Sequence, residues 1–277
     1  MEAGCITLRE FAECGAGGRR DGVKNAQQCI AVAVVGQRTF TVAGNQFGVI
    51  EIVAGVDAHA RGQAAAHRDF DVLVLDDNSP DKTADIAQEL GYPWVKVIRR
   101  PGKAGLGAAY RAGFEAVLQD DKYTHVVTMD ADGSHSVQDL QKMLTQGPTC
   151  DVVMGVRWIK GGSVTNWSLH RKLLSQFGTW YARKALKMKY RDLTGGLRVY
   201  RVNTLKRLNL DVIGSNGYCF QIEMIRAFSQ LNAHMSEIPI TFVEREHGKS
   251  KMSKSIVFEA FYLVSLWGIQ RILKINA

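Results

Sequence analysis

The chain has 277 residues, of which 46% are hydrophobic and 22% are charged, enough for one large domain or two small ones with a buried core. Its net charge of +8 favours an anionic partner, such as a phosphorylated substrate, an anionic lipid or a nucleic acid. Nucleic acid is the weakest of these, because no stretch interleaves aromatic and basic side chains and no zinc-finger or RNP-type motif occurs. The five cysteines form no Cys-x-x-Cys pair, which indicates neither a zinc site nor a disulfide framework and favours a reducing cytosol.

No segment is predicted to span a bilayer. The longest charge-free apolar run near the C-terminus covers residues 260–270, which is too short to cross a membrane. The N-terminus lacks a charged region followed by an apolar core, so no signal peptide is expected.

The first 69 residues show only weak signs of regular structure. Apolar runs at 29–35 and 47–53 are each compatible with a β-strand. Neither run is followed by a convincing helix before Phe70, and residues 55–68 are rich in Gly, Ala and Arg.

From residue 70 onward, strand and helix patterns alternate. Short apolar, β-branched runs predict strands over 70–75, 95–99, 126–129 and 150–156. Apolar residues at helical spacing predict helices over 81–90, 105–118 and 137–144, the first with Asp81 as its N-cap. This alternation indicates an α/β fold with a mostly parallel sheet, in which ligands bind beyond the carboxyl ends of the strands.

Two acidic turns fall at such strand ends. The first contains Asp76 and Asp77, and the second is Asp130-Ala131-Asp132, a DxD pattern. Two aspartates at i and i+2 after a buried strand point to the same side and can hold one hard divalent cation. Mg²⁺ also binds substrate phosphates, so the pattern suits a diphosphate ligand. The alternative is an ordinary acidic turn at a strand end.

Two helices with apolar faces are expected in the second half of the chain. After a Gly-rich loop at 157–165, a basic helix is predicted over 167–189. It is either an ordinary amphipathic helix with a solvated face or a helix that meets the acceptor or a membrane surface. The stretch 255–273 is apolar over much of its circumference, as in a buried terminal helix, a membrane-surface helix or a partner-binding helix.

Seven sequence blocks in the same order carry a resemblance to a known family. They lie at 76–81, 105–110, 129–135, 191–198, 217–223, 237–242 and 244–253. From Asp71 onward the sequence resembles the dolichol-phosphate mannosyltransferase family and, more narrowly, the bacterial polyprenol-monophosphomannose synthases. The resemblance implies an inverting glycosyltransferase with a GT-A fold that transfers mannose from GDP-mannose to a polyprenyl phosphate with Mg²⁺ or Mn²⁺.

The resemblance also implies roles for individual residues. The donor side would comprise Asp76 and Asp77 at the nucleoside, Asp130, Ala131 and Asp132 at the diphosphate, and Ser134 as a further metal ligand beside the two aspartates. The phosphates would be bound by Arg157 and, from a mobile loop, by Arg245 and Lys251, so that Asp132, Arg157, Arg245 and Lys251 form the catalytic set. Asp192 would lie on the acceptor side.

Some side chains keep two interpretations. The cations at 245, 249, 251 and 254 form either a solvated charge run or a phosphate site. Gln221 and Glu223 either contact the sugar or satisfy buried backbone groups. The acceptor phosphate is already an anion near neutral pH, since its second pKa is about 6, so a single displacement requires no strong general base.

The N-terminal segment departs from the family. Family members open with a strand that runs into Pro-Thr-Tyr-Asn-Glu, and no such motif occurs here. Residues 1–69 are therefore interpreted as an atypical segment, either disordered or produced by a shifted reading frame or a mis-started translation. Residues 70–254 are expected to form the glycosyltransferase domain, and 255–277 an apolar terminal helix.

Two alternatives to the leading function remain. One is a polyprenyl-phosphate glycosyltransferase that uses another nucleotide sugar, and the other is an inactive remnant without the nucleoside motif. The expected location is peripheral, at the cytoplasmic face of the membrane. Attachment would use the basic helix, the terminal helix or a membrane-embedded partner protein.

Overall fold

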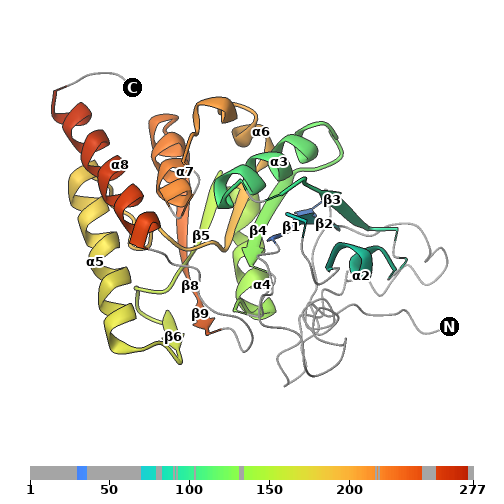
Figure 1. The fold of residues 1–277 in the computed structure, drawn as a ribbon, viewed down its shortest axis with the longest axis horizontal. Helices are drawn as coiled ribbons and strands as arrows, with labels where there is room; N and C mark the ends of the chain where they lie inside the picture. The colour runs from blue at the N-terminus through green and yellow to red at the C-terminus, as the bar shows by residue number, and fades with distance from the viewer. Residues whose placement is uncertain are drawn as a thin grey trace.

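A mixed β-sheet forms the centre of the molecule (Figure 1). The computed structural model describes residues 30–35, 70–78, 83–89, 91, 93–102, 104–130, 134–215, 217, 219–244 and 254–273. Within these ranges the sheet has seven strands, in the spatial order β3 Val95–Arg99, β2 Phe70–Asp76, β1 Ile30–Val35, β4 His125–Asp130, β7 Arg198–Arg201, β5 Val152–Val156 and β8 Met235–Pro239. A separate parallel pair consists of β6 Ser163–Thr165 and β9 Thr241–Val243.

The strand directions place several carboxyl ends at one edge of the sheet. β2, β3, β4, β5 and β8 run in one direction, whereas β1 and β7 run in the other. The expected parallel arrangement therefore holds for most described strands, and the sheet is mixed at β1 and β7. β1 lies between β2 and β4, where Ile30 pairs with both Leu75 and Asp130.

Helices cover both faces of the sheet because its strands bury side chains on both sides. They are α2 Thr83–Glu89, α3 Leu106–Leu118, α4 Val137–Gln146, α5 Leu169–Leu186, α6 Val202–Leu205, α7 Cys219–Gln230 and α8 Lys254–Ile272. Along β2, Leu73 and Leu75 belong to the core shared with α3 and α7, whereas Val72 and Val74 belong to the core shared with α2 and α4. This alternation follows from the two-residue period of a strand.

The helices α5 and α8 lie side by side at one end of the molecule (Figure 1). The Tyr181 ring of α5 stacks on the Phe261 ring of α8, with 4.7 Å between their centroids, and its hydroxyl is 2.7 Å from Ser265 Oγ. Among the described helices, none has the combination of length and apolar character that is needed to cross a bilayer.

Most of the elements predicted between residues 70 and 189 are confirmed, with some shifted bounds. β3 has the predicted bounds, and the first N-terminal apolar run contains β1, whereas the run at 47–53 and the proposed N-cap Asp81 lie outside the described residues. The expected loop at 157–165 is wrong at its end, because residues 163–165 pair with β9. The predicted basic helix is too long, since Lys187 adopts a left-handed conformation with φ of 59° that ends α5.

Candidate active site

Both acidic turns and Arg157 lie at the same edge of the sheet. β2, β4 and β5 run in the same direction, and each ends at or next to one of these residues: Asp76, Asp130 and Arg157. β1 separates Asp76 from Asp130, so their strands are two spacings apart, roughly 10 Å. The two acidic turns thus lie at the same end of the sheet, with β1 between their strands.

The first acidic turn is held by Arg100. The Arg100 backbone N–H donates to the Asp76 carbonyl at 2.8 Å, and its Nη1 atom lies 2.8 Å from Asp77 Oδ1. The Asp76 side chain is buried, and that of Asp77 is largely so. Arg100 thus holds the turn through both its backbone and its side chain.

The second acidic turn presents the Asp130 carboxylate to a cavity. Asp130 is 26% exposed, and its Oδ2 lies 3.7 Å from Nε2 of the buried His135. Ser134 is buried, and its carbonyl accepts a hydrogen bond from Val243 N at 3.0 Å, which ties this turn to β9. Ala131 and Asp132 lie outside the described residues. Among the residues that are described, no three His, Cys, Asp or Glu side chains gather as a metal site.

Arg157 forms a buried ion pair with Asp192. Its Nε and Nη2 atoms lie 2.6 and 2.8 Å from the two carboxylate oxygens, and Nη2 also donates to Thr194 at 3.0 Å. The side chains are 6% and 0% exposed. Burial alone would raise the pKa of Asp192, but the Arg157 charge and hydrogen bonds outweigh it, so the pKa lies below its usual value.

The guanidinium of Arg157 also lies among aromatic rings. Its Cζ atom is 5.3 to 5.7 Å from the ring centroids of Trp158, Trp167 and Phe242. These distances suit cation–π attraction. Arg157, which was expected to reach phosphates, is therefore held from one side by a carboxylate and from others by aromatic rings.

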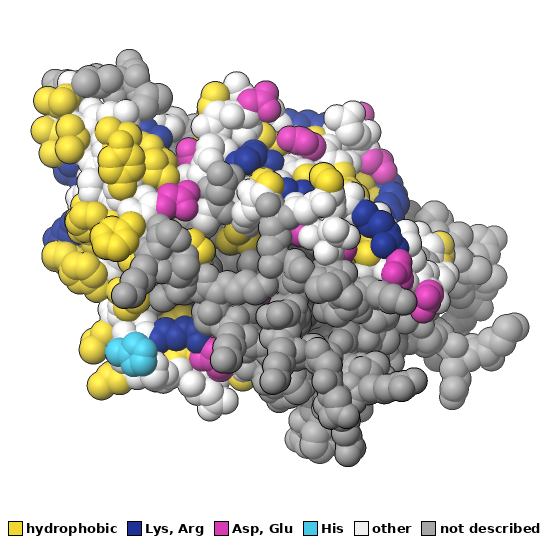
Figure 2. All heavy atoms as spheres, viewed as in Figure 1, with side chains coloured by type: hydrophobic (Ala, Val, Ile, Leu, Met, Phe, Trp, Pro, Cys, Tyr) yellow, Lys and Arg dark blue, Asp and Glu magenta, His cyan; other side chains and the backbone are white. Residues whose placement is uncertain are grey.

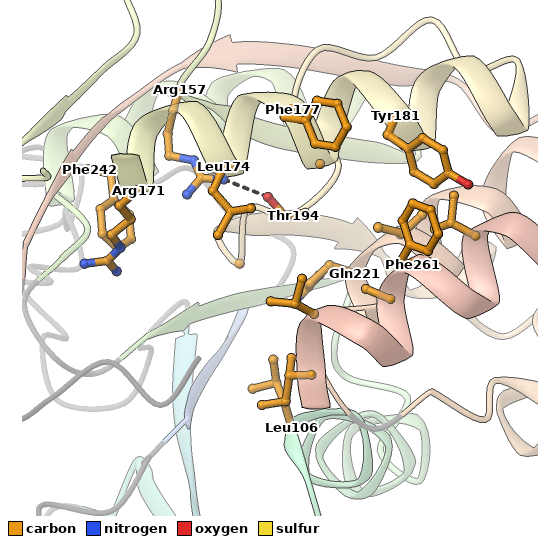
Figure 3. A pocket seen from close by; sticks show the side chains of 18 of the residues that line it. Leu106, Arg157, Arg171, Leu174, Phe177, Tyr181, Thr194, Gln221, Phe242 and Phe261 are labelled. Carbon is orange, nitrogen blue, oxygen red and sulfur yellow. Dashed lines mark hydrogen bonds between the residues drawn. The ribbon is translucent and has the colours of Figure 1, made fainter. Parts of the chain in front are cut away.

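A cavity extends from this polar edge between α5 and α8. Figure 3 shows Arg157, Arg171 and Phe242 toward one end, with Tyr181 and Phe261 toward the other. Its apolar walls include Leu174 and Phe177 from α5, and Ile256, Val257, Ala260, Phe261 and Val264 from α8. The cavity thus combines the polar side chains of Asp130, Arg157 and Arg171 with apolar walls from two helices.

Tyr110 and Gln221 also line the cavity. Both are buried, at 1% and 2% exposure. Burial raises the pKa of the Tyr110 phenol well above its usual value, and the Asp130 carboxylate raises it further. Glu223 satisfies backbone groups, which was one of its two expected roles. Its carboxylate accepts hydrogen bonds from the backbone N–H groups of Gly214 and Ser215.

Sequence reasoning missed some residues of this site. Arg171 lines the cavity, pairs with Glu244 and lies 4.0 Å from the Trp167 ring centroid, but the sequence marked it only as one cation of a basic helix. Tyr110 was predicted only as part of an apolar helix face. Arg245 and Lys251 were expected here and lie outside the described residues.

Comparisons with known proteins agree with this architecture. Residues 56–208 match the profile of glycosyl transferase family 2. The chain is 46% identical over 201 residues to an undecaprenyl-phosphate mannosyltransferase of Micrococcus luteus, which covers 72% of this chain and 82% of the relative. It is 42% identical over 203 residues to a polyprenol monophosphomannose synthase of Mycolicibacterium smegmatis, with 72% and 76% covered.

Solved structures give more distant matches. One is the glucosyl-3-phosphoglycerate synthase of Mycobacterium tuberculosis in complex with Mg²⁺ and UDP, at 18% identity and a TM-score of 0.48, with 73% of this chain and 68% of that chain covered. The family profile and the close relatives confirm the predictions of a GT-A fold and of a glycosyltransferase. The chain belongs to glycosyl transferase family 2.

Proposed function

We propose that the chain transfers mannose from GDP-mannose to a polyprenyl phosphate and releases GDP. The observation that carries this proposal is the cavity that joins Asp130 and two arginines to an apolar channel. A phosphate joined to a long hydrocarbon needs such a site, with polar groups at one end and apolar walls beyond them. The names of the two relatives, with 42% and 46% identity, support a mannosyl transfer to such a lipid.

Mg²⁺ or Mn²⁺ is the proposed cofactor, with Asp130, Asp132 and Ser134 as its protein ligands. Asp130 fits this role because its partly exposed carboxylate lines the cavity at a strand end. Few protein ligands suffice, since Mg²⁺ is usually held by one or two carboxylates together with substrate phosphates and water. When bound, the ion stabilises negative charge on the diphosphate. Asp76 and Asp77, with Ala131, would border the nucleoside diphosphate.

Transfer would be a single displacement at the anomeric carbon. A bond forms from an acceptor phosphate oxygen to this carbon as the bond from the carbon to the GDP oxygen breaks, and GDP leaves as an anion. The acceptor phosphate needs no strong base because it is ionised near neutral pH. Arg157 and Arg171 would orient it by charge-assisted hydrogen bonds, and Arg245 and Lys251, from the segment between β9 and α8, would bind the phosphates.

The ion pairs of these arginines limit how they can act. Asp192 occupies the Nε and Nη2 edge of Arg157, and Glu244 pairs with Arg171 Nη1. An arginine carries five N–H donors, so one carboxylate does not exhaust its hydrogen-bonding capacity. The carboxylates would fix the orientation of the guanidinium groups and offset part of their charge. The two arginines would therefore act mainly by placing the phosphate in a defined position.

The chain is proposed to work as a peripheral protein at the cytoplasmic face of a membrane. Hydrophobic side chains gather on the side of the molecule that α5 and α8 form (Figure 2). The most exposed of them include Leu169, Phe177, Trp180, Phe258 and Tyr262. Cations on α5, among them Lys172 and Lys184, would add attraction to anionic headgroups. A membrane-embedded partner protein is the alternative attachment.

Transfer of labelled mannose tests the proposed function. The purified chain is incubated with GDP-[¹⁴C]mannose, a polyprenyl phosphate in detergent, and Mg²⁺ or Mn²⁺, and the lipid fraction is counted. The proposal expects lipid-linked mannose that is abolished by EDTA and restored by added metal. UDP-glucose in place of GDP-mannose tests the alternative donor. A folded chain that labels no lipid with GDP-mannose contradicts the proposal.

A further inference from the structure

Two buried polar side chains, Tyr110 and Gln221, line the cavity and interact with each other. Tyr110 comes from α3 and Gln221 from α7. The Gln221 side chain interacts with the Tyr110 phenol, but within the described part of the chain Gln221 Oε1 accepts no hydrogen bond. Buried polar atoms are nearly always paired in folded proteins. An unpaired acceptor beside a phenol on a cavity wall therefore points to a ligand that makes hydrogen bonds there.

Gly196 opens the corner between Tyr110 and Asp130. A Cβ atom built on Gly196 would lie 3.6 Å from Tyr110 Oη and 3.7 Å from each carboxylate oxygen of Asp130. Both groups therefore face the same small volume, which glycine leaves open. These distances are ordinary van der Waals contacts, so an alanine at this position would fit the protein and fill part of the corner.

The chemistry of the corner suits hydroxyl groups. A neutral phenol and an amide both donate and accept hydrogen bonds, as sugar hydroxyls do. A phosphate would instead be matched by cations, and Arg157 and Arg171 lie elsewhere on the cavity wall.

We propose that Tyr110, Gln221 and the open face of Gly196 form the subsite for the hexose ring of the nucleotide sugar. Tyr110 Oη and Gln221 Oε1 would hydrogen-bond to its hydroxyls, while the ring occupies the volume beside Asp130. This inference rests on the proposed function, because it deepens the donor site of that reaction. Under this proposal Gln221 would contact the sugar, whereas Glu223 accepts from backbone N–H groups.

Three variants test the subsite in different ways. Tyr110→Phe and Gln221→Met each remove polar atoms with little change of shape, and Gly196→Ala keeps both side chains but occupies the corner. Tyr200→Phe is the matched control, since Tyr200 is buried in the same aromatic cluster through Phe114 but does not line the cavity. Thermal melting shows first which variants fold like the wild type.

The measurement is the dissociation constant of GDP and of GDP-mannose for each variant, by isothermal titration calorimetry with Mg²⁺ present. We expect an unchanged constant for GDP and a constant for GDP-mannose raised roughly 2- to 12-fold for each hydrogen bond lost. Gly196→Ala should also weaken the binding of GDP-mannose but not of GDP. Tyr200→Phe should change the dissociation constant of neither ligand.

The outcomes separate the subsite from the function. Equal weakening of both ligands, or unchanged GDP-mannose binding in the folded variants, overturns the sugar subsite alone. A wild-type chain that shows the expected selectivity but transfers no mannose to lipid overturns the proposed function alone. A folded wild-type chain that binds neither GDP nor GDP-mannose overturns both.

Discussion

Replacement of Asp192 by asparagine should strongly destabilise the protein. The substitution keeps the size of the side chain but removes the charge that compensates Arg157. Asp192 is fully buried and accepts from Arg157 Nε, Arg157 Nη2 and the backbone N–H groups of Arg157 and Thr194. Breaking a buried pair from one side costs about 3–5 kcal/mol, because the other charge stays buried without compensation.

This loss is large enough for a simple assay. At about 2–4 °C per kcal/mol for domains of this size, the melting temperature should fall by roughly 6–20 °C. Urea unfolding followed by tryptophan fluorescence gives the free energy of unfolding directly. Because the folded-state pKa of Asp192 is depressed, its contribution is present above the unfolded value of about 3.9 and is lost as pH falls through the lower folded value. The wild type and the variant should therefore converge in acid.

A double variant distinguishes loss of the ion pair from a general packing defect. Arg157→Met combined with Asp192→Leu removes both charges, so its cost should be smaller than the sum of the two single changes. A loss below about 1 kcal/mol for Asp192→Asn at pH 7, or simple additivity in the double variant, would refute the reasoning that this pair is a buried and compensated one.

Three further predictions concern metal, sheet and membrane. Asp132→Ala should abolish mannose transfer with unchanged circular dichroism, and a folded variant with full turnover would exclude it as a metal ligand. Val32→Pro should lower the free energy of unfolding by about 1–3 kcal/mol more than Val32→Ala, because β1 is paired on both sides and proline removes a ladder donor; equal melting temperatures would exclude this pairing. Phe258→Asp, at a side chain that is 72% exposed, should weaken binding to anionic vesicles roughly tenfold in co-sedimentation, and unchanged sedimentation would exclude α8 as a contact.

The sequence predicted elements well wherever their signal is local. β3 is a short β-branched run between polar residues, and α3 repeats apolar residues at helical spacing, so neighbours along the chain suffice to define both. The direction of β1 could not be predicted, because it depends on β2 and β4, which are remote in sequence. The end of α5 was missed because Lys187 adopts a left-handed conformation that glycine or asparagine would have indicated.

The candidate site shows the same division. Asp130 ends the apolar strand β4 and Arg157 directly follows β5, so the sequence alone predicts that both lie at the carboxyl ends of strands. The partner of Arg157 could not be predicted in this way, since Asp192 lies 35 residues further along the chain. Tyr110 belongs to the apolar face of α3 by its spacing, and only the approach of Gln221 and Gly196 from other elements shows that its hydroxyl faces a cavity.

The two helices that the sequence left with several interpretations are linked by the cavity between them. Phe177 of α5 and Phe261 of α8 line the cavity, and both are more than half exposed. Side chains that line a cavity and are also exposed to solvent lie at its mouth. The apolar channel therefore opens on the side where hydrophobic residues gather (Figure 2). If that side contacts a membrane as proposed, a polyprenyl chain can enter between α5 and α8 while its hydrocarbon stays in an apolar environment. The same geometry would direct the lipid phosphate inward, toward Arg171, Arg157 and the proposed sugar subsite.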